Sequence, residues 1–130
     1  MGDRCYMSLV CRRQDKERFE ELGFVLNCRD EGPLLEMEDA EANYAHCGDL
    51  PKDIPYHGSH GAGGDYGPGV FACDGTTYAE VEGGHNGGLV IHWDETTNRP
   101  LKSSLQAIRE YRSVEQAVRA QFEKLAACKK

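Results

Sequence analysis

The chain has 130 residues and a formal net charge of −7, and this length is typical of one domain that folds without a disulfide or a metal ion. Its 39% hydrophobic and 28% charged residues are ordinary for a globular protein and exclude a chain that is disordered throughout. Its apolar runs are far too short to span a membrane.

The charge is unevenly spread along the chain. Residues 1–100 carry nineteen acidic and eight basic side chains, whereas residues 101–130 carry three acidic and seven basic ones. An acidic body repels a polyanion, so nucleic-acid contact is expected only through the basic C-terminal segment. A protein partner is expected instead, and the acidic surface favours a basic one.

The six cysteines show no Cys-x-x-Cys pair, and no signal peptide is recognisable before them. This pattern predicts reduced thiols, mostly buried, in a cytoplasmic protein. The cysteines are Cys5, Cys11, Cys28, Cys47, Cys73 and Cys128.

The first elements predicted along the chain are a strand, a short helix and two more strands. Residues 5–11 alternate, which places one apolar set on a single face. That set is Cys5, Met7, Leu9 and Cys11. A short helix is predicted over 14–22, with Gly23 as its stop. Strands are predicted over 24–28 and 34–38.

The span 48–69 is predicted to be a long loop inside the domain. Its first part contains Pro51 and Pro55 and shows no period, and its second part, 56–69, has six glycines in fourteen residues. Loops of this length in a compact domain are either functional or poorly ordered.

A strand meander and a helical segment follow the loop. Strands are predicted over 70–73, 77–82 and 89–93, with Asp74-Gly75 as a tight turn between the first two. An apolar stripe at helical spacing then predicts an amphipathic helix within 101–127. This segment is either one helix or two, because Ser113 could cap a second helix.

These elements predict a single α+β domain over residues 1–130. Its sheet is mainly antiparallel with five to six strands, in the chain order β-α-β-β-loop-β-β-β-α, and the amphipathic C-terminal helix packs on one face. The short first helix is expected on the same face or at one end of the sheet. The predicted core consists of Met7, Leu9, Phe19, Leu22, Phe24, Leu26, Val81, Leu89, Ile91, Trp93, Ile108, Val118 and Phe122.

No motif in the sequence fixes a reaction, and no metal or cofactor is predicted. His46, Cys47, His57 and His60 lie close in sequence but lack the tight ligand pairs of a zinc site. The glycines of the loop fail the spacing of a phosphate-binding motif and lead into a strand rather than a helix. Nucleophilic catalysis would require spatial coincidences between cysteine and histidine that spacing alone does not indicate.

Carboxylates and a histidine on two predicted strands form another candidate site. Glu80 and Glu82 share one face of their strand with Tyr78, and His92 lies on the corresponding face of the next strand. Such a face could form the floor of a polar cleft, while a solvated sheet face gives the same pattern.

The favoured hypothesis is a small non-enzymatic binding protein that recognises a protein partner through residues 56–69. Tyrosine supplies contact area at a small entropy cost, and glycine lets a loop adapt to its partner. The alternative is a small enzyme or small-ligand-binding protein with a pocket under the same loop. A lone domain without a motif is also of a type found among accessory proteins of mobile elements. The predicted binding residues are Tyr56, His57, His60, Asp65, Tyr66 and His85.

Overall fold

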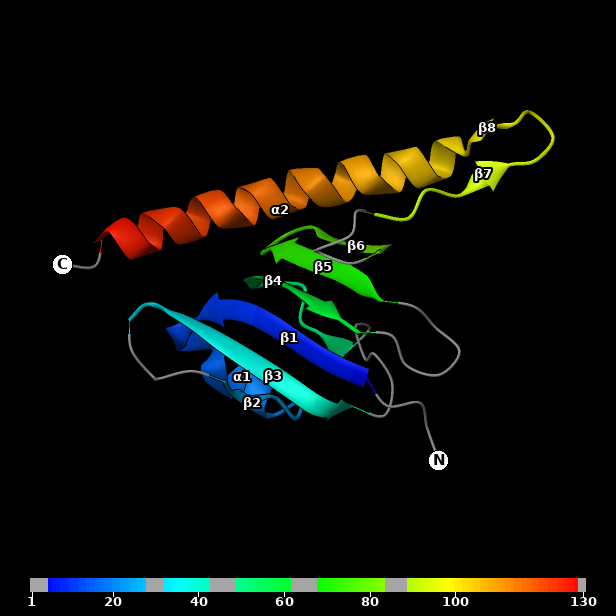
Figure 1. Ribbon diagram of the computed structural model, residues 1–130. Helices are drawn as coiled ribbons and strands as arrows, with labels where there is room; N and C mark the ends of the chain where they lie inside the picture. The colour runs from blue at the N-terminus through cyan, green and yellow to red at the C-terminus, as the bar shows by residue number, and fades with distance from the viewer. Residues whose placement is uncertain (1–4, 28–31, 43–48, 62–67, 84–88, 129–130) are drawn as a thin grey trace.

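Figure 1 shows a six-stranded antiparallel sheet with a long helix lying across one of its faces. The computed structural model describes residues 5–27, 32–42, 49–61, 68–83 and 89–128. The strands of the sheet are β1 (Cys5–Arg12), β2 (Val25–Leu26), β3 (Leu34–Ala42), β4 (Pro55–His60), β5 (Gly69–Asp74) and β6 (Tyr78–Glu82). Their order across the sheet is β2-β3-β1-β4-β5-β6. This architecture confirms the predicted α+β class with a C-terminal helix on one face.

A short helical segment and a small hairpin complete the fold. The segment is η1 (Arg13–Asp15) followed by α1 (Lys16–Glu20), and the hairpin pairs β7 (Trp93–Asp94) with β8 (Arg99–Pro100).

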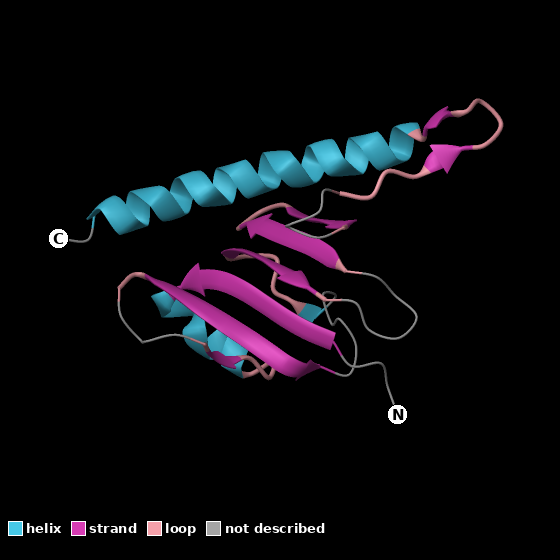
Figure 2. Cartoon of the chain, in the orientation of Figure 1, coloured by secondary structure: helices cyan, strands magenta, loops and turns pink. Residues whose placement is uncertain are grey.

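The C-terminal segment is one continuous helix, α2 (Lys102–Cys128), which settles the question of one helix or two. Its 27 residues correspond to a length of about 40 Å. It packs mainly on β5 and β6, whose six and five residues correspond to strands only about 20 Å long. The helix is therefore longer than the strands on which it lies, and Figure 2 shows the β7–β8 hairpin at its N-terminal end, beyond the sheet.

One face of the sheet packs against α1 and the segment before β4. Phe19 from α1 lies edge-on to Tyr56 from β4, with ring centroids 5.5 Å apart, and both side chains are fully buried. The Tyr56 hydroxyl donates a hydrogen bond of 2.6 Å to the carbonyl oxygen of Pro51. Fully buried Phe71 from β5 joins the same cluster. This face holds the larger of the two core clusters.

The other face of the sheet packs against α2. Alternation along β5 sends Phe71 to the first face, and it sends Val70 and Ala72 toward the helix. Val118 and Phe122 bury the apolar stripe of α2 against this second face. The first helix was predicted on the face of the C-terminal helix or at one end of the sheet. It lies instead on the opposite face, because Phe19 and Val118 belong to the two different core clusters.

The predicted loop 48–69 is wrong over residues 55–60, which form the central strand β4. Gly58 explains the error. A Cβ atom at this position would lie 2.2 Å from the backbone oxygen of Ser8 on β1. The glycine therefore permits a close approach of two strands instead of providing loop flexibility.

The last predicted strand, 89–93, is not part of the sheet. Leu89 makes only an isolated bridge to Gly83, and Trp93 pairs with Pro100 in the small hairpin. As a result Ile91 and Trp93, which were predicted in the core, are 43% and 57% exposed. The reason is that α2 already covers this side of β5 and β6, which leaves the segment no apolar surface of the sheet to cover.

The remaining core predictions divide into two groups. The partly buried ones are Leu22, Leu26, Val81 and Leu89. The buried ones, which confirm the prediction, are Met7, Leu9, Phe19, Phe24, Ile108, Val118 and Phe122.

Candidate functional site

The structure separates the predicted binding residues instead of gathering them on one loop. Tyr56 lies in the core and is not available to a partner. His57 points toward α2 and His60 lies at the end of β4, and both side chains are partly buried. Asp65, Tyr66 and His85 lie outside the described residues.

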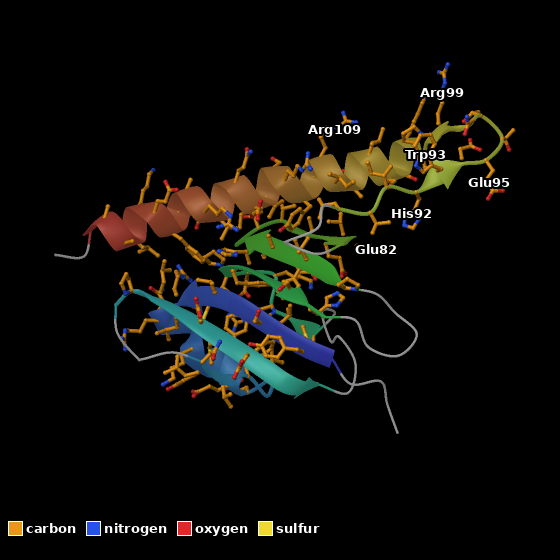
Figure 3. All side chains as sticks on the ribbon, in the orientation of Figure 1. Glu82, His92, Trp93, Glu95, Arg99 and Arg109 are labelled. Carbon is orange, nitrogen blue, oxygen red and sulfur yellow. The ribbon has the colours of Figure 1, made fainter. Side chains whose placement is uncertain are left out.

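Exposed apolar side chains occur in the segment that leads into α2 and in the first turn of the helix. We call this set, which consists of Val90, Ile91, Trp93 and Leu105, the hairpin surface. These are four of the six large hydrophobic side chains that are exposed in the described part of the chain. Figure 3 shows Trp93 beside the start of α2, with His92 and Glu82 on the side facing the sheet.

Hydrogen bonds hold the hairpin surface against its neighbours. The amide of His92 donates to the Ser104 hydroxyl at 3.1 Å, and the amide of Leu101 donates to the His92 carbonyl at 2.8 Å. The amide of Val90 donates to the carbonyl of Glu82 at 3.0 Å. The exposed side chains are therefore presented on a backbone tied to both α2 and β6.

A groove of about 600 Å³ opens beside this surface, and we call it the hairpin groove. It lies between β6, the start of α2 and the segment that carries His92. Its polar lining includes Glu80, Glu82 and His92, so the structure brings together three of the residues predicted on a polar strand face. Tyr78, the fourth, instead packs against the core cluster around Phe71.

His60 contributes a second imidazole to the hairpin groove. Its ring lies close to the backbone of Gly69, where a Cβ atom would be 2.5 Å from the His60 Nε2 atom. Pro68 and Gly69 line the same groove. The described end of the glycine-rich span therefore borders this groove, although the middle of the span lies outside the described residues.

The paired groups in the hairpin groove are well exposed. The Nε2 atom of His92 lies 3.1 Å from the Oε1 atom of Glu82, and the two side chains are 54% and 66% exposed. Active sites commonly exclude water from the groups that transfer protons, and this pair is not buried. The arrangement is suited to binding more than to proton transfer.

A second, smaller groove of about 300 Å³ lies further along α2, and we call it the helix groove. Residues of β1, β3 and β4 form its floor, and Tyr111, Glu115 and Arg119 from α2 form one wall. Glu115 accepts hydrogen bonds from the Tyr111 hydroxyl at 3.2 Å and from the Arg119 guanidinium at 3.1 Å. His57 lines the floor beneath this wall.

Burial controls the ionisation of the groups in the helix groove. Loss of solvent, together with the nearby positive charge of Arg119, lowers the pKa of His57 from 6.5 to about 4, so its imidazole is neutral near pH 7. Burial also raises the pKa of Tyr111, and the charge of Glu115 adds to this effect. On β1, the hydrogen bond that the Tyr6 hydroxyl donates to Glu38 raises the pKa of Tyr6.

The two buried thiols in the described residues are Cys11 and Cys73, and both are free. This agrees with the predicted reduced state for these two positions. Burial raises the pKa of Cys11 to about 12 and also raises the pKa of Cys73, so neither is an activated nucleophile.

Comparison with models of known protein families, with curated proteins and with solved structures finds no match to the chain. Among the described helices, none combines the length and the apolar composition that a membrane span requires. In the same part of the chain, no three histidine, cysteine or acidic side chains are grouped so that they could hold a metal ion.

The α2 wall of the helix groove was not predicted as a site. Its three polar residues, Tyr111, Glu115 and Arg119, repeat every four positions and therefore lie on one face of a helix. The sequence contained this signal, but the same spacing is common on solvated helix surfaces. Only the position of the sheet beneath the helix distinguishes a groove wall from such a surface.

Proposed function

We propose that this protein is a non-enzymatic binding protein that recognises a protein partner through the hairpin surface and the adjoining hairpin groove. The observation that carries the proposal is the exposure of Trp93, which is 57% exposed on a backbone fixed by hydrogen bonds. Exposed apolar patches rimmed by polar groups mark interaction sites, and tryptophan is enriched among the residues that dominate binding energy. The glycine-rich span predicted as the recognition element ends at this groove.

The charges near the site favour a basic partner. Glu80 and Glu82 line the hairpin groove next to the apolar side chains, and the chain as a whole carries a net charge of −7. A partner segment with an apolar side chain beside a lysine or arginine would complement both features. Long-range attraction would also raise the rate at which such a partner associates.

The alternative, a small enzyme or small-ligand-binding protein that uses the same site, draws support from the grouping of His60, His92, Glu80 and Glu82. The exposure of the His92–Glu82 pair weighs against catalysis, because both side chains are more than half open to water. The geometry therefore favours recognition of a macromolecule over chemistry on a small one.

Trp93 is the single tryptophan of the chain, so its fluorescence reports directly on the site. The test begins with affinity capture from the native host by the full chain, followed by titration of each purified candidate. A true partner should shift the Trp93 emission to shorter wavelength and bind saturably. The variant Trp93→Ser should weaken its binding by about thirtyfold, the loss expected for a dominant contact residue.

The matched control is Val25→Ser, because Val25 is equally exposed, at 58%, but lies on the edge strand β2 far along the sheet. This variant should bind the partner as the wild type does. The proposal fails if no captured protein distinguishes the two variants.

A further inference from the structure

The floor of the helix groove is an ordered grid of side chains. In the register of the sheet, Ser8 on β1 lies opposite Ser59 on β4, and Ser8 also lies opposite Glu38 on β3. In the next row that faces the groove, Val10 lies between His57 and Glu36 in the same way. Side chains directly opposite one another on antiparallel strands lie about 5 Å apart. Each row therefore runs from a carboxylate on β3 to a neutral polar group on β4.

The two sides of the groove differ in charge, because the β3 side carries carboxylates whereas the α2 side carries Arg119 paired with Glu115. Glu36 lines the groove on its β3 side and is exposed there, and Glu38, which accepts a hydrogen bond from the Tyr6 hydroxyl, lies opposite Ser8 two residues further along β3. The guanidinium of Arg119 lies on the α2 side, where its side chain is 56% exposed and is held by Glu115. Arginine has five N–H donors, so the bond to Glu115 leaves donors for a ligand carboxylate.

The separation of the two sides sets the size of a ligand that could reach both. The strands β3 and β4 are separated by β1 alone, which corresponds to about 10 Å between their axes. An extended peptide advances by about 3.4 Å for each residue. Two or three residues therefore span the floor from the carboxylates of β3 to β4, where Arg119 lies close enough to His57 to lower the pKa of that imidazole.

The groups between the two charged sides match the groups between the ends of a peptide. The hydroxyls of Ser8 and Ser59 and the neutral imidazole of His57 can each donate and accept a hydrogen bond. A peptide bond presents one donor and one acceptor. A simple anion would meet the carboxylates of β3, and a simple cation would make no use of the N–H donors that Arg119 has beyond its bond to Glu115.

We propose that the helix groove binds a short peptide of two or three residues by both of its free ends. Its ammonium group lies at Glu36 and Glu38, its carboxylate lies at Arg119, and its amides contact Ser8, Ser59 and His57. This site is separate from the hairpin surface, and none of its residues is used in the proposed protein recognition.

The test uses trialanine as the probe, with calorimetric titration of the full chain. Two capped forms accompany it, one acetylated at the amino end and one amidated at the carboxyl end. Trialanine should bind saturably, and each cap should weaken binding by about tenfold, the loss of one charge-assisted hydrogen-bonding contact.

The variants assign each end of the peptide to one side of the groove. In Arg119→Gln, trialanine should bind about tenfold more weakly, and amidation should no longer matter. In the double variant Glu36→Gln and Glu38→Gln, acetylation should no longer matter. Matched controls are Arg112→Gln, at an exposed position of α2, and Glu20→Gln, at an exposed position of α1, and both should bind all three probes as the wild type does.

Three results would overturn the proposal. The first is the absence of saturable binding of trialanine to the wild type, and the second is equal binding of the capped and free probes. The third is sensitivity to both caps that persists in the variants, which would place the peptide elsewhere. Far-UV circular dichroism of each variant shows whether it keeps the wild-type fold. Failure of the peptide proposal leaves the outcome of the Trp93 experiment unaffected, because the two sites share no residue.

Discussion

Acidification is expected to destabilise this protein through His57. The imidazole is partly buried between the sheet and α2, with its ring centroid 5.7 Å from that of Phe122. Desolvation is the main reason that its pKa falls to about 4, and the charge of Arg119 lowers it further while Glu115 opposes this. In the unfolded chain the imidazole would titrate at its ordinary value near 6.5.

The sign of the effect follows from which state binds the proton. Between pH 6.5 and pH 4 the unfolded chain takes up a proton at His57 that the folded chain does not, so unfolding is favoured as the pH falls. The contribution is complete above pH 6.5 and has been lost at about pH 4. At about 1.4 kcal/mol for each pH unit, the loss amounts to about 3 kcal/mol.

The measurement compares urea unfolding of the wild type and of His57→Gln between pH 7 and pH 4. Carboxylates titrate in both proteins, so the difference between the two pH profiles isolates His57. The wild type should lose about 3 kcal/mol more than the variant over this range. An NMR titration of the histidine ring protons gives the folded-state pKa directly. Parallel pH profiles, or a folded-state pKa near 6.5, would refute the burial argument.

Three further predictions concern the core. Phe122→Ala should lower the free energy of unfolding by about 3–5 kcal/mol, because Phe122 is 4% exposed against the sheet; an unchanged urea midpoint would reject its placement. Gly58→Ala should lower the free energy of unfolding by about 3 kcal/mol or more, because the added Cβ would lie 2.2 Å from the backbone oxygen of Ser8. In the control Gly61→Ala the atom nearest to the added Cβ is 3.9 Å away, so the free energy of unfolding should fall by less than about 1 kcal/mol. With the other cysteines changed to serine, Cys11 and Cys73 should react with a thiol reagent at pH 8 only after denaturation, and rapid labelling of the native protein would contradict their burial.

The sequence predicted the fold correctly where the apolar residues follow one clear period, either the alternation of a strand or the spacing of a helix. Alternation in 5–11 predicted β1 and its buried face, and Met7, Leu9 and Cys11 are buried as expected. The apolar stripe of the C-terminal segment likewise predicted α2 and its contact residues Val118 and Phe122. In both elements each side chain's environment follows from its place in a repeating pattern.

The prediction for 89–93 failed even though the period was present. Leu89, Ile91 and Trp93 alternate as a half-buried strand would. Alternation shows that a segment can present an apolar face, but it does not show whether another element already covers the available surface. Here α2 occupies the face of β5 and β6, so the same alternation produces an exposed patch. Two residues of the candidate interaction surface, Ile91 and Trp93, are therefore ones that the sequence predicted in the core.

In β4 the glycines led to a different error, because a strand was predicted as a loop. A glycine lowers the cost of a positive φ angle in a turn, and it also allows two backbones to approach closely in a sheet. The sequence alone does not distinguish a glycine needed for a turn from one needed for close packing of strands. They differ only in the identity of the opposing strand, which for Gly58 is β1, some fifty residues earlier in the chain. Because that pairing is a property of the whole sheet, the helix groove built on it, with His57 and Ser59 on either side of Gly58, emerges only once β4 is placed beside β1.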